Sequence, residues 1–425
     1  MSLDDFHFNI CHQKMTSLFV VGDLKKIKKQ FNIFNFSYLF VDAFRVSCEN
    51  GHLVVAKWLV EQKTKQKSKK ISNNVCFHHI DLAFHGACLK GHLEVAQWLF
   101  NLKPSIVNEQ YIFKKAFHEA CLNGHLETTK WLFDVKVFDV LDNAGVLFHE
   151  ACSKGQVESV KWLLEMKPDI DIFAWNQQAF RLACSNGHFE VAKWFFKIQP
   201  DVNAYTHYNI AFGGACANGH LTIAKWLLEM NPLLELEHEV DFCWACHNGH
   251  LETAKWLLEI KPNINISHGN DMAFRFACYD GHLETAKWLI EIKPDVDISY
   301  ENDLTFLWVC HNGHAKVAKW LLEIKPDINI SFKNESAFHG ACANGNVEVA
   351  QWFQSLRPWL YKITKKNNKL ISHINTKEEQ TAYFKEERFQ RRKYFVWLYS
   401  SSHLHKTSVL HTLPSELLRE IVMMV

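Results

Sequence analysis

The stretch DMAFRFACYDGHLETAKWLIEIKPDVDIS, residues 271–299, decides the fold, because its pattern recurs along the chain. Residues 273–280 are predicted to form a short apolar helix that ends at Gly281, since glycine tolerates the left-handed conformation of a helix end. Apolar residues on one face of a second helix follow the glycine: Leu283, Ala286, Leu289 and Ile290. Pro294 then ends the second helix. The stretch therefore predicts two helices joined by a turn and followed by a projecting loop.

The glycine of this stretch has counterparts along most of the chain, at spacings of 30 to 40 residues. These are Gly51, Gly91, Gly124, Gly155, Gly187, Gly219, Gly249, Gly281, Gly313 and Gly345. A cysteine stands three residues before each of them, and a tryptophan stands seven residues after each. This regularity predicts about ten tandem units of about 32 residues. Because one helix pair cannot bury its own apolar face, the units must stack into an all-α solenoid.

The unit resembles the ankyrin repeat. The segment AFHEACLNGH (residues 116–125) is similar to the first part of that repeat, and KPDIN (residues 325–329) is similar to its end. The D-x-x-G hairpin turn of the family is missing, which leaves open whether the loops form β-hairpins. The resemblance covers residues 38–360 and implies an ankyrin-repeat solenoid. The recurring wording A-C-x-x-G-H-L-E-x-A-K-W-L looks most like ankyrin proteins of large DNA viruses and their protist hosts.

The two ends of the chain depart from the repeat. Residues 1–37 contain a degenerate unit around Gly22 and are expected to be an N-terminal capping repeat. Its polar outer surface would come from Lys25, Lys26, Lys28 and Lys29. Residues 361–425 hold 12 Lys and Arg against six Asp and Glu, and are expected to form a small, basic, helical C-terminal tail.

The composition restricts the classes of function. With 48% hydrophobic and 13% aromatic residues, the chain can bury a core, which excludes disorder over most of its length. Its 47 Lys and Arg nearly balance 46 Asp and Glu, which argues against nucleic acid or an acidic membrane as the main partner. No apolar run is long enough to span a bilayer. We expect a monomeric cytoplasmic protein with reduced cysteines, the nucleus being an alternative location.

Side chains that could carry chemistry have simpler structural interpretations. His85 with Cys88, and His118 with Cys121, have helical spacing, but each pair belongs to its own unit and cannot supply four zinc ligands. The histidine that follows most of the glycines is predicted to bond a backbone carbonyl across the turn between units. The tryptophans are predicted to pack between units rather than to stack on bases. Without a nucleophile motif or a phosphate-binding loop, we expect no enzyme, no metal and no cofactor.

Positions that vary between units are the candidates for partner binding. The first helix and the loops usually hold the partner in ankyrin proteins, on the concave face. Two positions, five and two residues before the glycine, carry large aromatic or imidazole side chains in three consecutive units: Trp244, His247, Phe276, Tyr279, Trp308 and His311. Aromatic side chains dominate protein-binding hot spots, although at the first position they could also fill a semi-buried site. We expect the residues two before the glycine, His247, Tyr279 and His311, to be the more exposed.

The segment LPSELLREIVMMV at residues 413–425 is the clearest signal outside the repeats. It resembles the opening of an F-box, as in poxvirus ankyrin proteins, with the matching residues Leu413, Pro414, Glu416, Leu417, Leu418 and Ile421. The resemblance implies binding to a Skp-family adaptor and a cullin, so that the chain would bring captured proteins to a ubiquitin ligase. The alternative is a helix that caps the solenoid near Trp352 and Phe353. In either case the predicted function is that of a non-enzymatic protein-interaction scaffold.

Overall fold

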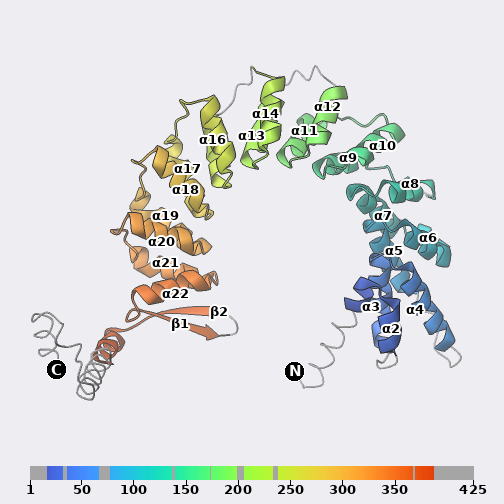
Figure 1. Cartoon of the computed structure of the whole chain (residues 1–425), viewed down its shortest axis with the longest axis horizontal. Helices are drawn as coiled ribbons and strands as arrows, with labels where there is room; N and C mark the ends of the chain where they lie inside the picture. Colours follow the sequence, from blue (N-terminus) through green and yellow to red (C-terminus); the bar gives the residue numbers. More distant parts are fainter. Residues whose placement is uncertain are drawn as a thin grey trace, which may run out of the picture. The chain divides into compact units, whose positions relative to one another are not determined.

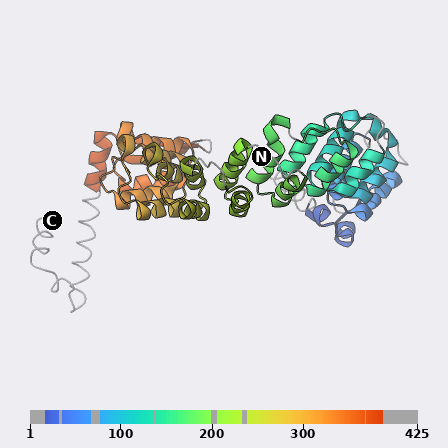
Figure 2. The ribbon, with the colours of Figure 1, turned by 90° about the horizontal axis from the view of Figure 1, so that it is seen from above.

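The structure, a computed structural model, describes residues 17–31, 36–66, 77–135, 139–172, 174–198, 205–232, 238–366 and 369–386. The chain divides into two compact units, residues 1–237 and 238–425. Each is a stack of helix pairs, as Figures 1 and 2 show from two directions. The all-α repeat architecture predicted from the glycine spacing is therefore confirmed.

The first unit, residues 1–237, opens with a helical turn at residues 17–21 and continues with helix pairs. Its elements are α2 (Leu24–Phe31), α3 (Phe36–Glu49), α4 (Leu53–Gln66), α5 (Phe77–Leu89), α6 (Leu93–Leu102), the 3₁₀ helix η2 (Pro104–Asn108), α7 (Gln110–Leu122), α8 (Leu126–Asp134), α9 (Ala144–Ser153), α10 (Val157–Met166), α11 (Ala174–Ser185), α12 (Phe189–Ile198), α13 (Tyr205–Ala217) and α14 (Leu221–Met230). Residues 17–31 repeat the helix, glycine turn and helix of the other pairs, as expected for a degenerate capping repeat.

The second unit, residues 238–425, continues the same pattern and ends in a small sheet. Its elements are α15 (His238–His247), α16 (Leu251–Ile260), α17 (His268–Tyr279), α18 (Leu283–Ile292), α19 (Tyr300–Asn312), α20 (Ala315–Ile324), α21 (Phe332–Ala343), α22 (Val347–Leu356), β1 (Tyr361–Lys366) and β2 (Lys369–Ile374). We call the two helices of each pair the first and second helix. Within each unit, first helices pack on first helices of the neighbouring pairs.

The turn between the two helices of a pair is fixed by a glycine and by a side chain of the next pair. Gly281 has a φ of +84°, and a Cβ on it would lie 2.3 Å from Nδ1 of His314. The histidine ring also reaches a backbone carbonyl of the preceding pair: His52 Nε2 lies 2.7 Å from Val20 O, and His188 Nε2 lies 2.8 Å from Ser153 O. The predicted histidine–carbonyl contact across the turn is therefore confirmed.

A ladder of phenylalanine and tryptophan side chains joins successive pairs. A phenylalanine seven residues before each repeat glycine is buried. In seven of the described pairs the tryptophan of the next second helix packs against its ring. The ring centroids of Phe84 and Trp131 are 6.2 Å apart, and those of Phe274 and Trp320 are 6.4 Å apart. The cysteines of the repeat are buried thiols, and burial raises the pKa of the Cys121 thiol to about 12. The tryptophans therefore pack between successive pairs, as predicted, and the phenylalanines and cysteines belong to the core.

In the second unit, residues with positive φ interrupt the first turn of three first helices, α17, α19 and α21, and the helical periodicity does not predict this left-handed turn. Gly269, Asn270 and Asp271 have φ values of 62°, 59° and 57°. The turn places Asp271 Oδ2 where it accepts a hydrogen bond of 3.0 Å from the Asp297 backbone N–H, and Asp303 Oδ2 receives the same bond from Asn329. Burial alone would raise the pKa of Asp271, but the Asp297 amide and the Lys293 ammonium outweigh it and lower the pKa. Each carboxylate thus fixes the loop that connects its own helix pair to the next pair.

A β-hairpin closes the last helix pair and begins the C-terminal tail. β1 pairs with β2 in antiparallel register, from Tyr361 opposite Ile374 to Lys366 opposite Lys369. Tyr361 is fully buried. Its ring lies 4.6 Å from that of Phe338 and 5.6 Å from that of Phe353, and its hydroxyl donates to Glu335. Tyr361 thus fills the apolar end of the stack, and the tail begins with this hairpin before its helix.

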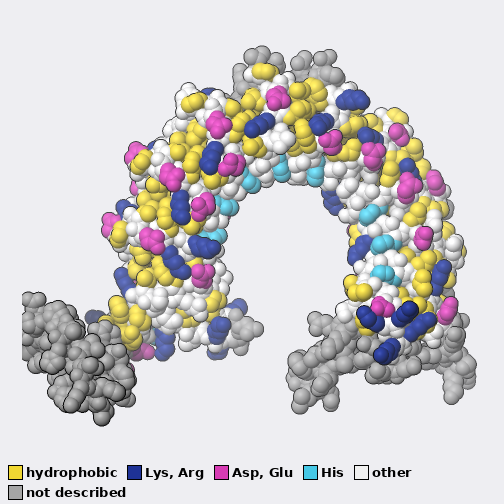
Figure 3. Space-filling view, viewed as in Figure 1, with side chains coloured by type: hydrophobic (Ala, Val, Ile, Leu, Met, Phe, Trp, Pro, Cys, Tyr) yellow, Lys and Arg dark blue, Asp and Glu magenta, His cyan; other side chains and the backbone are white. Residues whose placement is uncertain are grey.

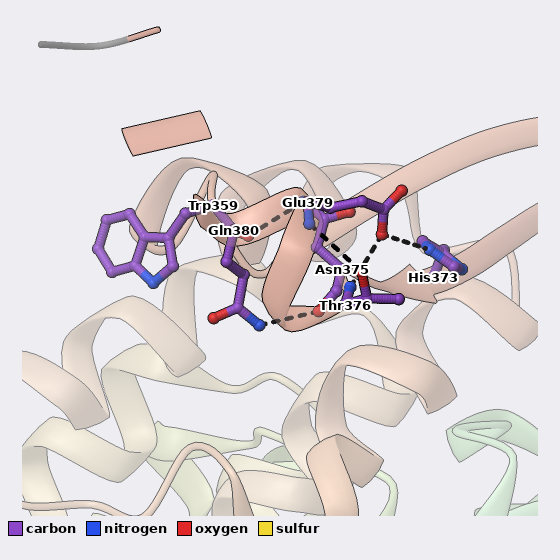
Figure 4. Close-up of polar contacts among 6 residues, drawn as sticks. All are labelled: Trp359, His373, Asn375, Thr376, Glu379 and Gln380. Carbon is purple, nitrogen blue, oxygen red and sulfur yellow. Dashed lines mark hydrogen bonds and ion pairs between the residues drawn. The ribbon is translucent and has the colours of Figure 1, made fainter. Parts of the chain in front are cut away.

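Residues 377–386 after the hairpin are helical, and side chains fix where this helix begins (Figure 4). The Thr376 N–H donates to Glu379 Oε2 at 2.8 Å, while the Glu379 N–H donates to Thr376 Oγ1 at 3.3 Å. This reciprocal pair is a capping box. Asn375 Nδ2 donates to the Trp359 carbonyl at 3.0 Å, and the Trp359 ring lies 5.5 Å from that of Phe384. The described part of the tail is therefore anchored to the end of the array.

The loops between the helix pairs contain turns, and none of the described loop residues forms a strand.

Acidic and basic side chains are interspersed over the face of each unit drawn in Figure 3. On the second helices several of them pair three residues apart, for example Glu284 with Lys287 at 3.6 Å. In the described ranges, no helix has the length and apolarity that crossing a bilayer would require.

Candidate functional site

The six residues singled out in the sequence lie on the first helices α15, α17 and α19 of the second unit. On each helix the two positions are three residues apart, so both side chains point from the same helix face. Contacts between rings link the helices. Trp244 stacks on His247, with ring centroids 5.0 Å apart, and His247 lies 4.8 Å from Phe276 on the next first helix. Tyr279 meets the edge of Trp308 at 5.9 Å.

Hydrogen bonds hold the two histidines of this row in place. His247 Nε2 lies 2.8 Å from Oδ2 of Asp280, which follows α17. His311 Nε2 lies 3.0 Å from the Ser336 carbonyl. A Cβ on Gly340 would lie 2.0 Å from His311 Nε2, so the glycine on α21 leaves room for the imidazole. The structure therefore brings all six predicted residues into one continuous row.

Their exposure differs from the expectation. Trp244 is 47% exposed, whereas the other five residues are half-buried. The residues two before the glycine are less exposed than Trp244 because His247 pairs with Asp280 and Tyr279 packs against Trp308. Of the tryptophans whose exposure the structure describes, Trp244 alone is exposed.

Three apolar residues that the sequence reading missed extend the row. Val240, Met272 and Leu304 stand four residues before Trp244, Phe276 and Trp308 and are half-buried. The sequence contains the signal that identifies them: all three stand nine residues before the repeat glycine. This places them one helical turn before the position of Trp244, Phe276 and Trp308, on the same face of the first helix. We call the nine residues the apolar face: Val240, Trp244, His247, Met272, Phe276, Tyr279, Leu304, Trp308 and His311.

The same positions in the first unit have a different chemistry. Five residues before the glycine, α5 carries Gly86, α7 carries Glu119 and α9 carries Glu150. His85 Nε2 lies 2.7 Å from Glu119 Oε2. Burial lowers the pKa of His118, although the nearby carboxylate of Glu150 acts in the opposite direction. At this position α7 and α9 therefore carry carboxylates where α15, α17 and α19 carry aromatic rings, and His85 and His118 stand one residue earlier than the compared position in their own helices.

Two further predictions concern metals and the C-terminus. Within the described ranges, no group of three or more His, Cys, Asp or Glu side chains is placed to hold a metal ion. The F-box-like residues lie in 413–421, outside the described residues.

A comparison with protein-family models agrees with the repeat architecture. A family model described as ankyrin repeats (3 copies) matches residues 84–174, 117–206, 148–235, 180–270, 212–302 and 274–358, which together cover more than half of the chain. Among solved structures, the chain is similar to the human ASB11 ankyrin repeat domain, with 22% identity, a TM-score of 0.35, and coverage of 49% of this chain and 96% of that one. A comparison with curated protein sequences finds no match. The chain therefore belongs to the ankyrin-repeat family, whose repeats are protein–protein interaction modules.

Proposed function

We propose that the chain is a non-enzymatic scaffold that captures a protein partner on the apolar face of its second unit. The observation that carries this proposal is the exposed Trp244 at the head of a continuous row of half-buried rings. Full burial of a large apolar side chain is worth about 1.5–3 kcal/mol, and Trp244, which is 47% exposed, forgoes part of this stabilisation. A partner that covers it recovers this free energy, and hot spots of interfaces are enriched in tryptophan for that reason.

The contacts among the rings of the row indicate that the surface is preorganised for binding. Trp244 and Phe276 both pack on His247, and Asp280 holds that imidazole. The rings therefore have few rotamers to lose on binding, which lowers the entropic cost of association. Neighbouring residues on the same helices, such as Met272, widen the contact area without adding charge.

Affinity purification with a double variant tests this proposal. We expect Trp244→Ala with Phe276→Ala to abolish capture of the partner that the natural chain retains. The matched control changes the equivalent positions of the first unit, Glu119→Ala with Glu150→Ala, and should leave capture intact. Equal capture by both variants and the natural chain would place the binding surface elsewhere.

We further propose that residues 413–421 recruit a Skp-family adaptor and a cullin, which would make the chain a substrate adaptor of a ubiquitin ligase. The support is the resemblance of LPSELLREI to an F-box opening after an ankyrin array. The closed end of the array favours this role over the cap alternative, because Tyr361 of the hairpin already packs on Phe353, which is fully buried. The resemblance of the repeats to those of large DNA viruses points to action in the cytoplasm of an infected host cell.

Truncation separates recruitment from capture. A chain ending at residue 400 should keep its partner and lose the Skp-family and cullin subunits. The double change Leu418→Lys with Ile421→Lys should have the same effect. If hydrogen exchange in residues 337–357 accelerates in the double variant, the segment is instead a structural cap.

A further inference from the structure

The apolar face also indicates the kind of partner it fits. We propose that its occupant is a basic amphipathic α-helix of a partner protein, lying across α15, α17 and α19. This inference rests on the proposed binding role of the apolar face and specifies its ligand. Spacing, the open side of Trp244 and charge are three separate arguments for it.

The spacing of the first helices favours a helical ligand over an extended one. Packed helices lie about 8–10 Å apart, so the equivalent residues Trp244, Phe276 and Trp308 recur at about that interval. In an α-helix, residues seven apart lie on one face and are separated by about 10.5 Å, at 1.5 Å per residue. In an extended chain, three residues span about 10 Å, but residues three apart point to opposite faces. A ligand helix can therefore place one side chain against each of α15, α17 and α19, and a strand cannot.

Trp244 offers a site for a cation at one end of the row. Its ring stacks on His247 with an interplanar angle of 21°, so one face of the indole is occupied. Because 47% of the residue is still exposed, its other face can accept an arginine or lysine of the ligand. Such a contact is most favourable on tryptophan.

The charge around the apolar face is negative. On the first helices and loops of residues 239–335 there are ten carboxylates and five basic side chains, a net charge of −5. The carboxylates are Glu239, Asp241, Asp271, Asp280, Asp295, Asp297, Glu301, Asp303, Asp327 and Glu335; the basic residues are Lys261, Arg275, Lys293, Lys325 and Lys333. Glu301 is exposed and stands three residues before Leu304 of the apolar face. A ligand with lysine and arginine beside its apolar stripe complements this field.

The repeat itself provides a conservative charge-reversal variant. Lys333 of α21 stands 32 residues after Glu301, at the equivalent position of the next pair, and both have a positive φ, 50° and 49°. Glu301→Lys therefore introduces a lysine at a backbone position where the next pair already has one, Lys333. The matched control is Glu284→Lys on the second helix α18, where the glutamate side chain is 76% exposed.

Three labelled peptides test the inference on the full chain by fluorescence anisotropy. The first has leucine at every seventh position and lysine and arginine on the flanks of a helix. The second replaces those basic residues with glutamate, and the third keeps the basic composition but has prolines that prevent a helix. We expect the first peptide to bind about tenfold more tightly than either of the others, and to weaken as salt is added. Trp244→Ala should abolish this binding, and Glu301→Lys should weaken it several-fold while Glu284→Lys does not.

Each other result overturns a defined part of the inference. Equal binding of the acidic peptide would refute the charge, equal binding of the proline peptide would refute the helix, and binding that survives Trp244→Ala would refute the site. A chain ending at residue 386 lacks the basic residues Arg388, Arg391, Arg392 and Lys393. If it bound the basic peptide much more tightly than the full chain, the occupant would be this segment of the chain itself and not a partner. If no peptide bound although the Trp244 and Phe276 double variant lost its natural partner, this inference would fail while the proposed function stood.

Discussion

The two units share one scaffold and differ in the side chains that their first helices present. Phe117 in the first unit and Phe274 in the second occupy the same buried position and meet the tryptophan of the next pair at 6.2 and 6.4 Å. Two residues after these phenylalanines, the first unit has Glu119 and the second has Phe276. The positions that recur therefore determine the fold, and the positions that vary determine what the surface binds.

The largest expected effect concerns the scaffold that both units share. Phe117→Ala and Phe274→Ala each remove a fully or almost fully buried ring. Each should destabilise the chain by about 3–5 kcal/mol, the usual effect of truncating a buried aromatic residue. Urea unfolding followed by circular dichroism measures it. A much smaller effect for one of the two would show that the units do not depend on the same ladder.

The next effect concerns the surface that distinguishes the units. Giving the second unit the residue of the first, by Trp244→Glu with Phe276→Glu, should weaken partner binding by about 2 kcal/mol or more. The thermal midpoint should change little, because Glu119 and Glu150 occupy the same positions in a folded first unit. Calorimetric titration with the purified partner, together with a melting curve, tests both statements. A collapse of the melting curve would mean that the two rings belong to the core.

A smaller effect is expected at the turn that joins the helices of a pair. Gly281→Ala should destabilise the chain by about 1–2 kcal/mol for the left-handed conformation alone, and further because the new Cβ would meet His314. Adding His314→Ala should recover part of the loss, so the two changes should not be additive. The corresponding pair in the first unit, Gly155→Ala with His188→Ala, should behave alike. Strict additivity in a double-mutant cycle would contradict the contact.

The smallest effect is a dependence of stability on pH. Burial lowers the pKa of His314 below its ordinary value of 6.5, although Asp280 and the Tyr279 carbonyl act in the opposite direction. His92, His220 and His282 have lowered pKa values for the same primary reason. As the pH falls through 6.5, the unfolded chain therefore binds protons that the folded chain does not, and stability decreases.

Melting temperatures at pH 7.5 and 5.5 measure this dependence. His314→Asn should reduce it, because Asn346 occupies the same position in the last pair without a titrating ring. An unchanged or increased melting temperature at the lower pH would contradict the assigned direction.

The fold could be predicted because it repeats, and parts that occur once could not. Ten glycines with a cysteine and a tryptophan at fixed distances predict helices, turns and junctions together. Tyr361 has no counterpart in the repeat, so nothing in the pattern predicted that it would fill the end of the stack and begin a hairpin. The left-handed turn at the start of α17 was also missed, because its carboxylate, Asp271, acts on an amide 26 residues away.

The candidate site was predicted in its members and less well in its exposure. Comparing the repeats within the chain was enough to select Trp244, Phe276 and Trp308. Relative exposure depends on which side chain a neighbour covers: Trp308 has Tyr279 against it and His247 has Asp280, whereas Trp244 remains open. Contacts of that kind join residues about 30 positions apart, which a single repeat does not reveal.

The junction between pairs also bears on how such a chain can change its length in evolution. At Gly155, Gly187, Gly249 and Gly281, the histidine that packs on the glycine stands 33 residues further along the chain. A tandem duplication or deletion of one repeat length, wherever it begins, therefore restores a complete glycine–histidine contact at the new boundary. The array can gain or lose binding surface by unequal recombination without a separate change that repairs the joint.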